Sequence, residues 1–159
     1  MSEQNPELQQ VFQGERNNEE VQMKDYTENE QKNIRQQETK RRLLEAVSQG
    51  KETSELLWET LVAWQEVPFR TVSGLPFTYT IRQGKRGQLT KELWIDRREG
   101  SKSLSFGSIR LAFENACRIK YAERPKAMGD IRGVSYMYPV FWTLGLIDVP
   151  PQYAEKMKV

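Results

Sequence analysis

Cationic side chains gather in one stretch of the chain, within a sequence that is typical of a hairpin and in the segment that follows it. They alternate with glutamine, serine, glycine and one tryptophan. Phosphate groups are bound by such a mixture, because cations supply charge, hydroxyl and amide groups orient the ligand, and glycine permits close backbone approach. The pattern predicts a nucleic-acid-binding surface, DNA or RNA, whose candidate residues are Arg82, Lys85, Arg86, Lys91, Trp94, Arg97, Arg98 and Lys102.

The distribution of charge supports this prediction. The formal net charge is only +2, but it is unevenly divided. Residues 1–68 contain 8 Lys/Arg and 14 Asp/Glu, whereas residues 69–133 contain 14 and 6. Such a division is typical of an acidic segment beside a basic binding surface. The competing interpretation is that these cations are ordinary solvated surface, spread over the molecule.

An aromatic cluster near the C-terminus offers an alternative function. Four rings fall within one expected helix, and they could either fill the core or form a surface for a protein partner. If the rings were exposed together, the chain would act as an adaptor or inhibitor. The candidate partner-binding residues are Tyr136, Tyr138, Phe141 and Trp142.

Catalytic chemistry has little support in the sequence. The chain has no histidine, which excludes Ser-His-Asp and Cys-His catalysis and histidine-containing metal sites. Asp96, Glu99 and Lys102 could form a Mg²⁺-dependent nuclease site, but salt bridges to neighbouring arginines are the commoner role of such carboxylates. Cys117 is the single cysteine and is expected to be an inert, small apolar side chain. We therefore assign no catalytic residue, metal site or cofactor.

The elements that would position these residues follow from hydrophobic period and helix-ending signals. Helices are expected over about 28–49, 53–64, 106–121 and 136–144, with Ser105 as N-cap of the third and Ser135 of the fourth. Strands are expected over 69–72, 77–81 and 92–96, with residues 97–103 as a polar loop. Strict alternation places Phe77, Tyr79, Ile81, Leu93 and Ile95 on the core face and directs Trp94 and the charged residues outward.

Together these elements predict an α+β fold, in which a helical hairpin and two further helices pack on an antiparallel sheet of two or three strands. We expect residues 1–27 to be an acidic, amide-rich disordered tail, 28–151 a single domain and 152–159 a free tail. No signal peptide is recognised and no apolar run reaches the roughly 20 residues of a membrane-spanning helix. A soluble, cytoplasmic protein without membrane contact is therefore expected, and its oligomeric state is left open.

Short motifs in residues 68–147 resemble those of a group of small bacterial proteins without an assigned activity. The resemblance implies one compact α+β unit and nothing about mechanism. The basic segment 83–90 and the acidic N-terminal extension look like additions to the shared pattern. The motifs are Thr71-x-x-Gly74-Leu75-Pro76-Phe77-x-Tyr79-x-Ile81, Ser101-Lys102-Ser103 before a helix, Tyr136-x-Tyr138-Pro139-x-Phe141 and Leu144-Gly145-Leu146-Ile147.

Overall fold

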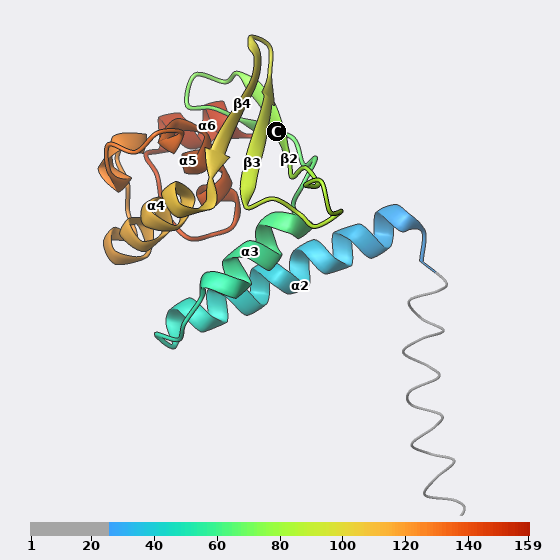
Figure 1. The fold of residues 1–159 in the computed structure, drawn as a ribbon. Helices are drawn as coiled ribbons and strands as arrows, with labels where there is room; N and C mark the ends of the chain where they lie inside the picture. The colour runs from blue at the N-terminus through green and yellow to red at the C-terminus, as the bar shows by residue number, and fades with distance from the viewer. Residues whose placement is uncertain (1–25) are drawn as a thin grey trace, which may run out of the picture. The chain divides into compact units, whose positions relative to one another are not determined.

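Helix α2, Glu28–Ser48, begins with a capping box in the computed structural model, which describes residues 26–159. The Glu30 N–H donates to Thr27 Oγ1 (3.2 Å), and the Thr27 N–H donates to the Glu30 carboxylate (3.3 Å). The chain divides into two units, Met1–Glu38 and Thr39–Val159, and α2 runs through the division (Figure 1). Most of the expected disordered tail, residues 1–25, lies outside the described residues.

The second unit begins with the predicted helical hairpin. It consists of the C-terminal half of α2, followed by α3, Ser54–Ala63. The Thr60 hydroxyl donates to the carbonyl of Leu56 in its own helix at 2.6 Å and lies 3.3 Å from the carbonyl of Thr39, so the two helices approach closely at this buried position. Gly50, with φ of 66°, lies in the turn between them, in the left-handed region that favours glycine.

Four antiparallel strands form the sheet, in the order β1-β2-β3-β4. β1 is Phe69–Arg70, β2 is Pro76–Thr80, β3 is Glu92–Arg97 and β4 is Gly100–Ser105. The α+β class is therefore as predicted, but the sheet has one strand more than expected. β4 occupies the segment that we expected to be a polar loop, and it pairs with β3 over six residues.

The core lies between one face of the sheet and the helices, and the predicted core face of β2 and β3 is confirmed. Phe77, Tyr79, Leu93 and Ile95 are all buried. The Tyr79 hydroxyl donates to the carbonyl of Leu61 at 2.6 Å, which joins β2 to α3. Burial raises the pKa of this hydroxyl well above its usual range, so it remains a donor.

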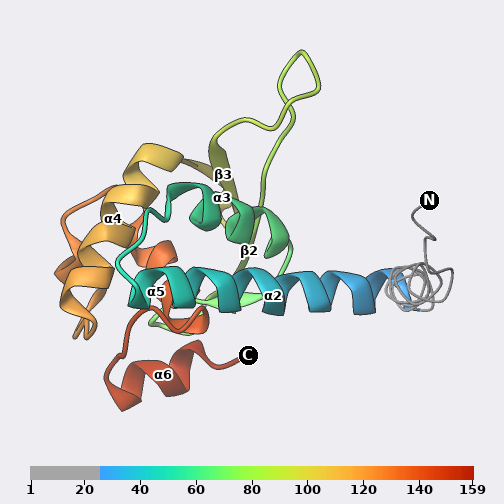
Figure 2. The ribbon, with the colours of Figure 1, turned by 90° about the horizontal axis from the view of Figure 1, so that it is seen from below.

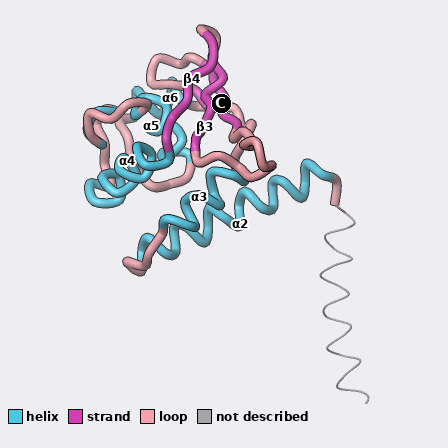
Figure 3. The backbone as a smooth tube through the Cα atoms, viewed as in Figure 1, coloured by secondary structure: helices cyan, strands magenta, loops and turns pink. Residues whose placement is uncertain are grey.

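Helices α4, Phe106–Ile119, and α5, Val134–Thr143, follow the sheet and lie on one side of it (Figure 3). The Ser105 side chain accepts from the Ser108 N–H, so the predicted N-cap of α4 is confirmed. The N-cap of α5 is Gly133 rather than Ser135. A short 3₁₀ helix η1, Pro125–Met128, lies between these two helices in the sequence.

The expectation that residues 152–159 form a free tail is wrong. Residues Pro151–Met157 form helix α6, and Met157 is only 2% exposed. Tyr153 packs edge-on against Tyr138, with ring centroids 6.4 Å apart. No helix within residues 26–159 is both long and apolar enough to cross a membrane.

Candidate nucleic-acid interface

The basic loop between β2 and β3 is held in a defined conformation by its own backbone. The Gly84 N–H donates to the carbonyl of Gln88 (2.6 Å), and the N–H and hydroxyl of Thr90 both donate to the carbonyl of Arg82 (2.9 Å). Gly87 has a φ of 81°, which favours glycine at the tip. The loop therefore extends the hairpin, and Figure 2 shows it projecting beyond α3.

The loop contains four cationic residues. Arg82, Lys85, Arg86 and Lys91 are exposed, and no carboxylate occurs between the first and the last of them. None of the four forms an ion pair in the part of the chain that the structure describes. The loop therefore presents concentrated positive charge to solvent, as the sequence pattern predicts.

Trp94 lies on the face of the sheet opposite the core, as predicted. The Arg82 guanidinium is stacked on its ring, with Cζ 3.6 Å from the ring centroid. Trp94 pairs across the sheet with Thr80 on one side and Ser103 on the other. Neither hydroxyl residue is among the eight candidates named from the sequence, although strand alternation already placed Thr80 opposite the core.

Lys91 is fixed at the base of the loop by two aromatic rings. Its ammonium lies 4.6 Å from the centroid of Trp58 in α3 and 5.1 Å from that of Phe106 in α4. The Phe106 N–H donates to the carbonyl of Lys91 at 2.9 Å. The first turn of α4 therefore lies beside the loop, so that the positive end of its helix dipole adds to the charge there.

The other three predicted cations lie at the opposite end of β3, about 20 Å away at roughly 3.3 Å per residue. Arg98 is exposed in the β3–β4 turn. Arg97 and Lys102 are half-buried and belong to β3 and β4, which corrects our expectation that residues 97–103 form a polar loop. They share the core face with Ile95, because Lys102 pairs directly with Ile95, and Arg97 follows Ile95 by two residues.

The rings of α5 do not form the exposed surface expected for a protein partner. Tyr138 and Phe141 are completely buried, and Tyr136 and Trp142 are half-buried. The Tyr138 hydroxyl donates to the carbonyl of Ala122 at 2.6 Å, and burial raises the pKa of this hydroxyl above its usual range. Two of the rings belong to the core and the other two pack against it, so the four do not form one exposed patch for a protein partner.

The carboxylates of the hairpin do not assemble a metal site. Asp96 lies on the outer face of β3, and Glu99 lies in the β3–β4 turn. Across residues 26–159, no group of three or more Asp, Glu, Cys or His residues is close enough to hold a metal ion. The geometry therefore gives no support to the nuclease alternative.

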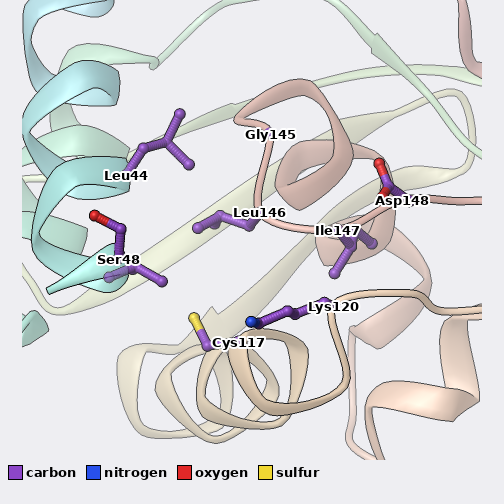
Figure 4. Close-up of a pocket in the computed structure, with 9 residues that line it drawn as sticks. Leu44, Ser48, Cys117, Lys120, Gly145, Leu146, Ile147 and Asp148 are labelled. Carbon is purple, nitrogen blue, oxygen red and sulfur yellow. The ribbon is translucent and has the colours of Figure 1, made fainter. Parts of the chain in front are cut away.

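A pocket of about 420 Å³ lies on another part of the second unit, between α2, α4 and residues 145–148. Aliphatic side chains, including Leu44 and Leu146, line much of it, and Figure 4 shows the Lys120 side chain directed toward Cys117. Burial, followed by the charge of Glu114, raises the pKa of the Cys117 thiol to about 11. The thiol is therefore protonated at neutral pH and offers no nucleophile.

This pKa predicts slow alkylation of Cys117. At pH 7.5 we expect iodoacetamide to modify the folded protein about 100-fold more slowly than the protein in urea, because the thiolate fraction falls tenfold per unit of pKa. The rate should rise about tenfold per pH unit up to about pH 11. Mass spectrometry measures both rates. Equal rates in the folded and unfolded protein at pH 7.5 would contradict the burial of the thiol.

The candidate interface is therefore supported only by its geometry and by the chemistry of its residues. The resemblance of residues 68–147 to small bacterial proteins stays a prediction. Comparisons of the chain with protein-family models, curated proteins and solved structures find no match.

Proposed function

We propose that this chain binds nucleic acid, without catalysis, through the loop 82–91 and the adjoining outer face of the sheet. The observation that carries the proposal is the loop itself, which bears four exposed cations and no carboxylate. A phosphodiester backbone is the polyanion that such a surface suits, since each neutralised phosphate releases a condensed counterion.

The fixed shape of the loop supports the same proposal. Because its backbone hydrogen bonds are already formed, little conformational entropy is lost when a ligand is bound. Lys85 and Arg86 lie at the tip, and Lys91 lies at the base next to the first turn of α4. Phosphates along a strand could therefore contact the tip and the base together.

The outer face beside the loop suits a base better than a phosphate. Glu92 and Asp96 flank Trp94 along β3, and their negative charge disfavours phosphate there. The Arg82 guanidinium covers one face of the Trp94 ring and presents a flat, cationic surface. Aromatic rings and arginine planes stack on bases of any sequence, at about 1–3 kcal/mol per base. We therefore expect binding with little sequence preference.

The salt dependence of binding tests this proposal. We expect a 12-nucleotide single strand, DNA or RNA, to bind at 20 mM salt, with affinity falling linearly on logarithmic axes as salt increases. The slope should be about −2 if Lys85, Arg86 and Lys91 contact phosphates while Arg82 stacks on a base, at about 0.7 per contact. Fluorescence anisotropy of a labelled oligonucleotide measures it.

Two results would overturn the proposal. One is the absence of binding at 20 mM salt, where electrostatic attraction is least screened. The other is an affinity that salt does not change, since phosphate contacts necessarily release counterions. A duplex of the same length, measured in parallel, shows whether unpaired bases are needed for the stacking expected at Trp94.

A further inference from the structure

Two cations meet at the turn end of the sheet, apart from the loop 82–91. Arg97 and Lys102 are half-buried on the core face, where they are diagonal neighbours on adjacent strands. Both approach one ring of α5: Arg97 Cζ lies 5.7 Å and Lys102 Nζ lies 5.8 Å from the centroid of Tyr136. Two positive charges thus lie within 6 Å of the centre of one tyrosine ring.

No carboxylate neutralises this pair within the described part of the chain. Neither Arg97 nor Lys102 forms an ion pair there. Asp96 lies on the opposite face of the sheet, and Glu99 lies in the turn without an ion pair to either cation. Like charges on neighbouring strands at a half-buried position repel each other, and a bound anion would lower the free energy of this arrangement.

The hydrogen-bond donors at this position exceed the acceptors. Arg97 Nη1 donates to the Tyr136 hydroxyl at 2.6 Å, and Arg97 Nε donates to the carbonyl of Gly100 at 3.2 Å. These bonds fix the guanidinium, and its second Nη group has no acceptor within residues 26–159. The Tyr136 hydroxyl accepts from Arg97, so its own hydrogen remains available, and no acceptor for it is found among residues 26–159. The Lys102 ammonium also lacks an acceptor in this part of the chain.

We propose that Arg97, Lys102 and Tyr136 form a binding site for a phosphate group. A tetrahedral phosphate has several oxygens that accept from different directions, which matches an arginine, an ammonium and a hydroxyl that offer only donors. The phosphate is either free in solution or the terminal phosphate of an oligonucleotide. Inorganic phosphate tests the site without any oligonucleotide, so the result is independent of the function proposed for the loop.

Isothermal titration calorimetry of the full chain with inorganic phosphate, at low ionic strength, tests this site. We expect wild-type protein to bind phosphate and K102M to bind it at least tenfold more weakly. Methionine keeps most of the length of the side chain and removes the charge, and one charge-assisted hydrogen bond accounts for about this factor. R98M is the matched control, because Arg98 is exposed in the adjoining β3–β4 turn, and no hydrogen bond or cation–π contact joins it to Tyr136 within residues 26–159. It should bind phosphate like the wild type.

Thermal unfolding provides a second readout. Phosphate should raise the melting temperature of the wild type above that in chloride of equal ionic strength, and this difference should disappear in K102M. The proposal is overturned if phosphate does not bind, or if R98M loses as much affinity as K102M. Tighter binding of a 5′-phosphorylated than a 5′-hydroxyl oligonucleotide, abolished by K102M, supports a terminal phosphate as the ligand. Equal binding of both oligonucleotides, together with a positive titration, supports free phosphate.

Discussion

Changing Lys85 and Arg86 together to glutamine is expected to lower the affinity for a single-stranded oligonucleotide about 100-fold at 50 mM salt. The electrostatic part of the affinity vanishes near 1 M salt. Two phosphate contacts increase the affinity by roughly this factor when the salt concentration is lowered from 1 M to 50 mM. Both side chains are exposed and form no hydrogen bond or ion pair with the described residues, so the free energy of unfolding should not change. Fluorescence anisotropy of a labelled 12-nucleotide strand measures the loss.

The double change K156Q/K158Q is the matched control. It removes the same charge from α6 and its end, which lie far from the loop in the second unit (Figure 2). Both lysines are exposed, and Lys158 forms only a surface ion pair with Glu155 (3.6 Å). We expect an affinity within about threefold of the wild type, because charges this distant are screened. An equal loss in both variants would show that net charge, and not the loop, attracts the ligand.

Gly133→Ala is expected to lower the free energy of unfolding by about 3 kcal/mol. Gly133 has a φ of 84°, which a residue with a Cβ adopts only at a cost of about 1 kcal/mol. A Cβ at this position would also lie 2.1 Å from Cδ2 of Leu104, which is buried in β4. Relieving this overlap requires a shift of packed groups, which typically costs 1–3 kcal/mol. Urea denaturation measures the change.

Gly107→Ala serves as the control for that experiment. Gly107 lies in the first turn of α4, is exposed, and has nothing within 4 Å of an added Cβ. Alanine is a better helix former than glycine, so this change should raise the free energy of unfolding by up to about 1 kcal/mol. An equal change in the free energy of unfolding for both substitutions would contradict the close approach of Gly133 to Leu104 in β4.

Elements with a strong local pattern could be predicted from the sequence. Alternation in residues 77–81 and 92–96 correctly gave the core face of β2 and β3. Gly50 and Ser105 marked helix boundaries, because a left-handed turn and a side-chain cap are local features.

The elements that were missed depend on contacts distant in the sequence. β4 contains three serines and one buried residue, Leu104, so its composition is that of a loop. It is a strand because it pairs with β3 along its whole length. Helix α6 is similarly polar, and its position is secured by Met157 and by the Tyr153–Tyr138 contact. Neither partner could be identified from these segments alone.

The charged residues of the site could be predicted from the sequence, but their division into two separate groups could not. The sequence placed all eight candidate residues on one surface, whereas the strand pairing separates them into two groups at opposite ends of β3. The contact of Lys91 with Trp58 and Phe106 joins three elements of the chain and has no local signal. Arg97 faces inward because β3 extends one residue further than expected, so that Arg97 continues the parity of Leu93 and Ile95.

Nuclear magnetic resonance of the ¹⁵N-labelled chain tests the central claim most directly, because it locates the contact residue by residue. On addition of a 12-nucleotide single strand at low salt, we predict the largest shifts at the backbone amides of residues 82–91 and at the indole N–H of Trp94. Shifts confined to residues remote from this hairpin, or no shifts at all, would contradict the proposal that this loop binds nucleic acid.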